Sequence, residues 1–167
     1  MKKFIICAIC AICGFTTANA QAKFGHVNSQ EIIQVMPEYT KAKTEIEALT
    51  AQYEADLKSM QDELQKKGEA FEKEQATLPD NIKQRRQQEL QDMYQKIQQS
   101  FQDNQQALQK KQQELMQPVL TKVRNAITNV GKTGGYTFIF EDGVAIYTGT
   151  NVEDVTAKVQ AEIAKMK

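Results

Sequence analysis

The chain has 167 residues, of which 25% are charged, with 21 basic and 21 acidic side chains and no tryptophan. This even balance gives no electrostatic basis for binding nucleic acid. Glycine and proline are sparse, and Gln, Glu, Lys, Asp and Ala dominate the middle of the chain, which is typical of long solvated helices and excludes a large globular core. We therefore expect one domain with most of its surface exposed to water.

The first twenty residues have the pattern of a secretory signal peptide. Residues 2–3 are lysines, an apolar run covers 4–15, and the Ala-Asn-Ala motif at 18–20 completes the pattern. A run of about a dozen apolar residues is shorter than the roughly twenty that a helix needs to span a bilayer, so we prefer a cleaved signal to a membrane anchor. Cleavage is expected between Ala20 and Gln21.

All three cysteines, Cys7, Cys10 and Cys13, lie inside that apolar run. Their removal with the signal would leave a mature chain without disulfides or thiol chemistry. A lipid-modified Cys13 is the weaker alternative, because the bulky Ile12 stands where lipoprotein signals carry a small residue. Without Lys2 and Lys3 the mature chain has 19 basic and 21 acidic side chains, a net charge of about −2.

The mature chain begins with a short strand and a short helix. Residues 23–28 predict the strand, and the spacing of Asn28 and Glu31 is that of a capping box at a helix start. Pro37 is expected to interrupt or restart that helix. His26, the only histidine, is interpreted as a strand residue, because no second imidazole or mature cysteine could complete a site with it.

Residues 37–131 predict two long helices folded back on each other. Apolar side chains recur every three or four positions on both sides of a single break at residues 78–80. Thr77, Pro79 and Asp80 carry helix-start signals there, so this is the expected tip. Gly131 is expected to end the second helix as a C-cap.

Residues that face each other in such a hairpin should have numbers that sum to about 158. The sum pairs apolar residues in register: Leu64 with Tyr94, Leu57 with Phe101, and Met60 with Ile97. These positions are therefore predicted to form the hairpin core, and only outward-facing members could touch a bound protein. The match fails at Phe71, which would face Gln87, so we expect the outer part of the arm to be the more mobile end.

The C-terminal region predicts a β-hairpin followed by a helix. Residues 136–140 and 144–147 alternate as strands do, and Glu141-Asp142-Gly143 suits a type I′ turn. A final helix is expected to begin after Thr150 or Asn151, with an apolar stripe of Val152, Val155, Val159, Ile163 and Met166.

The predicted fold class is α+β, with a long antiparallel helical hairpin as a coiled-coil arm on a small β body. The predicted divisions are a signal peptide (1–20), a strand and short helix of the body (21–36), the arm (37–131), and the β-hairpin and final helix of the body (132–167). Three short strands in one copy leave a thin core with open edges, so an oligomer is expected to complete the body.

This order of elements resembles the Skp/OmpH family of periplasmic chaperones over essentially the whole mature chain. The resemblance rests on residues 24–29 at the front, the Gln/Lys-rich arms, and residues 136–147 and 151–156 at the back. It implies a homotrimer whose strands form a joint body, with three arms around a cavity that holds unfolded outer-membrane β-barrel proteins without ATP.

The resemblance also implies a periplasmic location and roles for particular residues. Phe24, Val27, Phe138, Phe140, Val144 and Ile146 would be positions of the oligomeric body. The seven arm residues Leu57, Met60, Leu64, Phe71, Tyr94, Ile97 and Phe101 would be hairpin core or contacts to the bound protein. The chain departs from the family in charge, because its best-known members are strongly basic and this mature chain is nearly neutral. Apolar and amide contacts would then carry more of the binding.

No catalytic, metal or cofactor-binding arrangement is predicted, because the acidic residues are scattered and residues 131–135 lack the pattern of a phosphate loop. Two alternatives remain open. One is a structural or adaptor coiled coil of the cell envelope that binds one folded partner. The other is a membrane-peripheral protein that uses its amphipathic arms, since membrane contact is not required but is not excluded.

Overall fold

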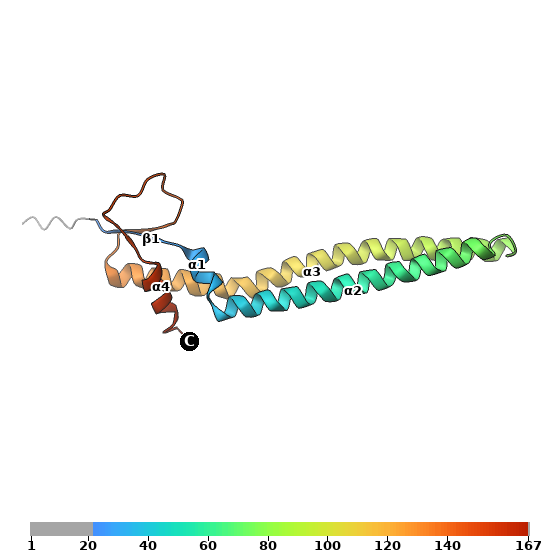
Figure 1. Ribbon diagram of the computed structural model, residues 1–167, viewed down its shortest axis with the longest axis horizontal. Coiled ribbons are helices and arrows are strands. Elements are labelled where there is room, and N and C mark those ends of the chain that lie inside the picture. The colour runs from blue at the N-terminus through green and yellow to red at the C-terminus, as the bar shows by residue number, and fades with distance from the viewer. Residues whose placement is uncertain (1–21, 167) are drawn as a thin grey trace, which may run out of the picture.

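The computed structural model describes residues 22–166 (Figure 1), so the predicted cleavage site between Ala20 and Gln21 lies outside the described residues. Two long helices run side by side away from a small body that contains the remaining elements. This confirms the predicted fold class of a long helical hairpin on a small β body. The elements are β1 (Phe24–Val27), α1 (Ser29–Gln34), α2 (Pro37–Glu74), α3 (Asp80–Gly134), β2 (Phe138–Glu141), β3 (Val152–Asp154) and α4 (Thr156–Ile163).

The N-terminal elements begin where local chemistry favours a helix start. The side-chain oxygen of Asn28 accepts a hydrogen bond of 2.9 Å from the Glu31 N–H, which confirms the predicted cap of α1. Pro37 occupies the first turn of α2, where its missing N–H leaves no carbonyl unpaired. The predicted interruption at Pro37 is therefore confirmed.

The arm consists of α2 and the first two thirds of α3. The 38 residues of α2 give it a length of about 57 Å at 1.5 Å per residue. Four ion pairs join the two helices, and their residue numbers sum to 156 for Lys67–Glu89 and Glu45–Lys111 and to 160 for Glu74–Arg86 and Glu38–Lys122. The predicted antiparallel register near 158 is confirmed.

The tip differs from the prediction in the role of Thr77. Its hydroxyl donates to the Glu74 carbonyl at 2.9 Å, so it closes the end of α2 and does not cap α3. The carbonyl of Pro79 accepts from the N–H groups of Ile82 and Lys83 and starts α3 without a side-chain cap. Asp80 in the first turn places a negative charge at the positive end of the helix dipole, as expected.

The prediction that Gly131 ends the second helix is wrong. Helix α3 continues to Gly134, and Gly135 is the C-cap, with a left-handed φ of 66°. At this helix end Gly135 uses the backbone freedom of glycine, because its N–H turns back to the Gly131 carbonyl. Gly131 remains an ordinary helical residue beside Ile139.

The predicted β-hairpin is also wrong. Strands β2 and β3 both pair parallel with β1, in the order β2-β1-β3, and residues 144–147 form no strand. The turn at Glu141-Asp142-Gly143 does form, since the Val144 N–H reaches the Glu141 carbonyl at 3.2 Å and Gly143 has a φ of 80°. The chain after this turn does not return along β2, because β1 is the hydrogen-bonding partner of β2 and residues 152–154 take the other edge of β1.

The final helix begins later than predicted. Thr150 and Asn151 precede β3 and do not cap α4, which starts at Thr156 after the N-cap residue Val155. Val152 therefore belongs to a strand. Val155, Val159 and Ile163 are buried, as the predicted stripe requires. The helix start was predicted too early because Val152 of β3 has the same sequence spacing as the apolar stripe of α4.

One core holds the body together, and it gathers side chains from β1, α1, α3 and α4. The last third of α3 supplies Val119, Val123, Ala126 and Val130, all buried. Pro118 lies inside α3 immediately before this buried segment. Its missing N–H removes one helical hydrogen bond where α3 passes from the arm into the body. The other buried members of the core are Val27, Ile32, Met36, Val155, Val159 and Ile163.

Candidate interaction surfaces

Aromatic side chains cover the face of the sheet that points away from the core. Alternation along β1 buries Gly25 and Val27 and leaves Phe24 on the opposite face. The rings of Phe24 and Phe138 stack with centroids 6.2 Å apart, and those of Phe138 and Phe140 with centroids 5.8 Å apart. Phe138 and Phe140 are exposed. Three stacked rings on this strand face form an apolar surface that residues 22–166 leave largely exposed.

A loop of residues 142–151 extends this apolar surface. Val144 is exposed, Tyr147 is 84% exposed, and Ile146 is fully exposed. The loop and the sheet enclose a cavity of about 120 Å³ lined by Phe24, Phe140, Ala145, Tyr147 and Val152, among others. Exposure of such large aliphatic and aromatic side chains to water is unfavourable in free energy unless another surface covers them.

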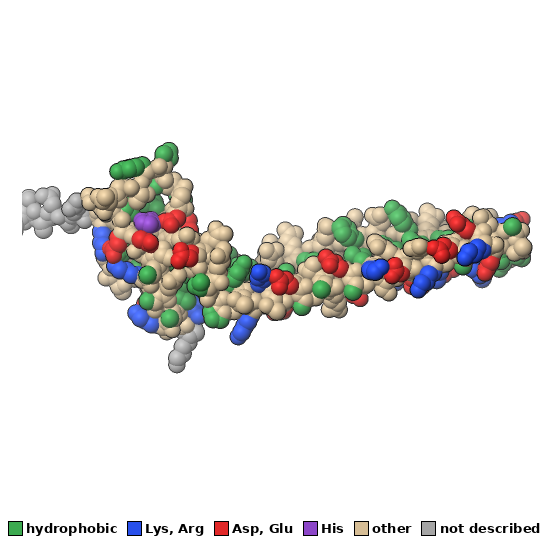
Figure 2. Space-filling model, in the orientation of Figure 1, with side chains coloured by type: hydrophobic (Ala, Val, Ile, Leu, Met, Phe, Trp, Pro, Cys, Tyr) green, Lys and Arg blue, Asp and Glu red, His purple; other side chains and the backbone are tan. Residues whose placement is uncertain are grey.

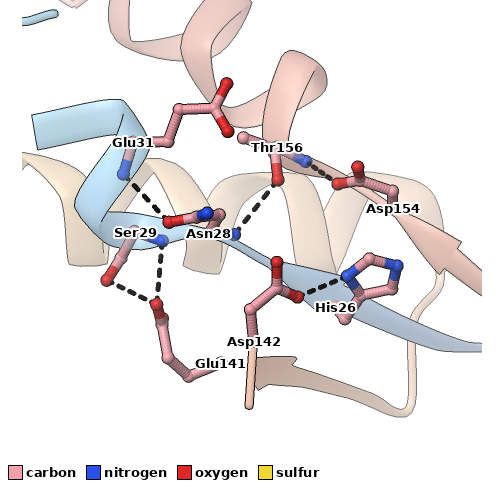
Figure 3. A network of polar contacts seen from close by, with 8 residues as sticks. All are labelled: His26, Asn28, Ser29, Glu31, Glu141, Asp142, Asp154 and Thr156. Atoms are coloured by element: carbon pink, nitrogen blue, oxygen red, sulfur yellow. Dashed lines mark hydrogen bonds and ion pairs between the residues drawn. The ribbon is translucent and has the colours of Figure 1, made fainter. Parts of the chain in front are cut away.

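One side-chain contact ties this loop to the sheet. The Nδ1 atom of His26 lies 2.5 Å from a carboxylate oxygen of Asp142 (Figure 3), and the Asp142 N–H donates to the Val27 carbonyl at 2.9 Å. His26 is therefore a strand residue that anchors the start of the loop. Among residues 22–166, no group of three or more His, Cys, Asp or Glu side chains is placed to hold a metal ion.

Polar contacts join the carboxyl ends of the three strands (Figure 3). Beyond β1, Ser29 donates its N–H and its hydroxyl to Glu141 at the end of β2, at 2.9 and 2.8 Å. The Asn28 N–H donates to the Thr156 hydroxyl beyond β3 at 3.1 Å. The pKa of Asp154 is lowered, chiefly because the side chain and the N–H of Thr156 hydrogen-bond to its carboxylate. These contacts hold the strands at the positions that present the aromatic face.

At the other end of the sheet, Glu153 is the centre of a second polar cluster. Its carboxylate accepts from Lys158, from the Tyr136 hydroxyl at 2.5 Å, and from Lys23, whose ammonium lies 3.2 Å away. These partners, Lys158 first, lower the pKa of Glu153 from 4.5 to about 2. The ammonium of Lys23 also lies 4.0 Å from the Tyr136 ring centroid. Sequence reasoning missed this cluster, because its members lie far apart in the chain. Lys23 precedes the arm, Tyr136 follows it, and the other two residues belong to β3 and α4.

The six body positions predicted from the sequence separate into two groups. Val27 is buried in the core of the chain itself and presents nothing to a partner. The other five, Phe24, Phe138, Phe140, Val144 and Ile146, lie on the aromatic face or its loop. We call these five together with Tyr147 the apolar face of the body. Tyr147 was not among the candidates, because alternation along the predicted strand would place it on the face opposite Val144 and Ile146.

The seven arm positions also separate. Leu57, Met60, Leu64 and Ile97 are half-buried between the helices. Phe71 is only 8% exposed although it was expected to face Gln87; Lys67, Arg86 and Leu90 lie around it. Tyr94 is 56% and Phe101 is 51% exposed, so the interpretation of these two as hairpin core is wrong. An in-register position on a two-helix hairpin can still point outward, because only two helices are present to cover it.

Within residues 22–166, no helix is long and apolar enough to cross a membrane. Among residues 22–166, exposed aromatic side chains lie on the apolar face of the body and on the outward side of the arm. Both are open surfaces.

Comparison with known proteins agrees with the fold. The family profile described as "Outer membrane protein (OmpH-like)" matches residues 23–163. The crystal structure of an OmpH-like protein from Caulobacter crescentus CB15 superposes with a TM-score of 0.76 at 15% sequence identity, covering 89% of this chain and 88% of that one. At this identity the likeness shows the fold alone. No curated protein sequence matches the chain.

Proposed function

Because the chain belongs to the OmpH-like family of outer membrane proteins, we propose that it is an ATP-independent holdase chaperone. It binds unfolded outer-membrane β-barrel proteins and keeps them from aggregating on their way to the outer membrane. The observation that carries this proposal is the arm, on which Tyr94 and Phe101 of the long helix α3 are half exposed.

Binding by open surfaces suits a client without a fixed shape. Many weak contacts along an arm add up when they act together, and none of them is strong enough to prevent release. The alternative is that each ring is an isolated apolar side chain on a protein surface, which is common and needs no functional explanation. Two aromatic rings seven residues apart lie on the same side of α3, which favours a shared contact.

Assembly of three chains would complete the body. The apolar face described above has no cover in one copy, and β2 and β3 each have one edge without a strand partner among residues 22–166. Strand edges and aliphatic side chains of this kind are buried when copies associate. We propose a homotrimer whose three arms surround a cavity, in the periplasm after removal of residues 1–20.

The decisive experiment is suppression of client aggregation by the mature protein. An outer-membrane β-barrel protein diluted from urea should scatter light strongly alone and weakly in the presence of about one trimer per client. Multi-angle light scattering should give the mass of three chains. A monomer, or client scattering unchanged by the protein, would contradict the proposal.

Selectivity separates a holdase from an adaptor coiled coil of the envelope. A holdase should bind several unrelated unfolded β-barrel proteins and ignore their folded forms, whereas an adaptor should prefer one folded partner. Liposome flotation without client tests the membrane-peripheral reading, which predicts binding to vesicles of the protein alone.

A further inference from the structure

The side of α3 that carries Tyr94 and Phe101 is free of charge. Residues three and four positions away share a helix face, and for these two rings they are Leu90, Gln91, Ile97, Gln98, Asn104 and Gln105. None of the six is ionisable. Each ring is flanked by a glutamine three residues before it and another four residues after it, so Gln91, Tyr94, Gln98, Phe101 and Gln105 alternate along the surface. We call these five residues the amide strip.

Charge on this part of α3 is confined to other sides of the helix. Asp92, Lys96 and Asp103 lie two residues from a ring position, a spacing that points them away from the amide strip. In Figure 2 the upper edge of the middle of the arm carries hydrophobic and neutral surface, and the charged side chains run along the face below it that is turned to the viewer. The strip is therefore a feature of one face and not of the whole arm.

The two arm helices differ in the polar side chains that solvate them. Helix α2 has sixteen charged residues and three glutamines among 38. Residues 84–117 of α3 have nine charged residues and fourteen glutamines among 34. A face that needs only to be solvated is usually supplied with charges and i,i+4 ion pairs, as Lys43–Glu47 and Lys58–Asp62 do on α2. Around the two exposed rings of α3, glutamines stand where charged residues would be expected, and solvation alone does not explain that choice.

Glutamine supplies the hydrogen-bonding groups that an unfolded main chain needs. Its side chain offers one carbonyl acceptor and two N–H donors, and each residue of an unfolded chain, proline apart, has one N–H and one carbonyl to satisfy. All three glutamines of the strip are exposed, and Gln98 holds the Tyr94 hydroxyl at 2.9 Å. From Gln91 to Gln105 the strip covers fifteen residues, and its ends lie about 21 Å apart along the helix, the length of about six residues of extended peptide.

We propose that the amide strip binds the main chain of an unfolded polypeptide while Tyr94 and Phe101 take up its apolar side chains. This inference rests on the proposed holdase function and names the chemistry of the contact. Because the strip has no charge, it attracts neither a phosphate group nor a charged lipid surface, and it accepts client segments of either sign. Client binding should therefore change little between low and high salt.

The test places charge on the strip without changing its helix propensity. Two double variants, Gln98→Glu with Gln105→Glu and Gln98→Lys with Gln105→Lys, are compared with wild type for affinity to a urea-unfolded β-barrel client. Glu, Lys and Gln favour helix to nearly the same degree, so folding should be retained and is checked by circular dichroism. Gln52→Glu with Gln61→Glu on α2 is the matched control, since both side chains are exposed there.

Both strip variants should weaken client binding about tenfold, because either charge must lose water when an apolar or main-chain segment covers it. The control should stay within about twofold of wild type, as surface substitutions ordinarily do. Weaker binding with Glu but tighter binding with Lys would overturn the proposal in favour of electrostatic capture. Unchanged binding in both would overturn it as well.

A further outcome assigns the strip to contact between copies of the chain. If the variants change the mass measured by light scattering, a second α3 occupies the strip and the proposal is overturned. Failure of the proposed function is distinct from all of these results, because it appears as aggregation of the client in the presence of the wild-type protein.

Discussion

At the scale of single residues, the carboxyl group of Glu153 has the most strongly shifted pKa. Its carboxylate accepts from Lys158, Tyr136 and Lys23, which lowers its pKa to about 2. The contacts fasten β3 to α4 and to the chain on either side of the arm. They matter because β3 is only three residues long, and these contacts add to the hydrogen bonds that pair it with β1.

We expect Glu153→Gln to lower the melting temperature at neutral pH and to lose this effect in acid. A lowered carboxyl pKa contributes stability above the unfolded value of 4.5, and that contribution disappears as pH falls from 4.5 towards 2. Circular dichroism melts of both proteins at several pH values across this window measure the difference. Glu54→Gln, at an arm residue without a hydrogen bond or ion pair among residues 22–166, is the control. A difference that is constant with pH would contradict the assignment.

At the scale of elements, the arm is held together unevenly. Between Ala42 and Val119, Phe71 alone has a buried side chain, and the other contacts between α2 and α3 are half-buried residues and exposed ion pairs. Exposed ion pairs contribute little stability, so Phe71 is the largest buried apolar contact in the outer part of the arm. The expectation of a mobile outer arm stays a prediction, and Phe71 is the residue through which to test it.

We expect Phe71→Ala to loosen the tip while the body stays intact. Removing the ring should increase amide hydrogen exchange on both sides of the tip by about tenfold or more, because the lost burial is not replaced. Exchange in the body should not change, since its core lies at the opposite end of the arm. Phe101→Ala is the matched control, because the same change at an exposed ring should leave exchange near the tip as in wild type. Equal loosening of the body would show that Phe71 supports the whole fold.

At the scale of the whole molecule, one copy of the chain is incomplete. Its sheet has three short parallel strands, and helices and a core cover only one face. The other face carries Phe24, Phe138 and Phe140, with the fully exposed Ile146 beside them. This surface explains why assembly is expected even though the residues that were expected to pair as a hairpin do not pair in one chain.

We expect Ile146→Asp to convert the assembled protein to single chains without unfolding it. Ile146 contributes nothing to the core of one copy because it is fully exposed, so the charge should cost only the contact between copies. Light scattering measures the mass, and circular dichroism measures helix content. Val35→Asp, another exposed aliphatic position that lies away from the sheet, should leave the mass unchanged. A trimeric mass for Ile146→Asp would place the interface elsewhere.

The sequence by itself determined the arm, since helical periodicity, Pro37 and the break at Pro79 depend on neighbours within a few residues, and the antiparallel register follows from a tight tip. It also determined the cap at Asn28, the helix start at Pro37 and the buried stripe of α4. Only the tertiary structure decided the path of residues 136–155. Local alternation predicts a strand but cannot say which strand it will pair with, and β1, more than a hundred residues away, took both neighbours in parallel. The outward direction of Tyr94 and Phe101 was decided in the same way, because exposure depends on how many helices surround a position and not on its spacing.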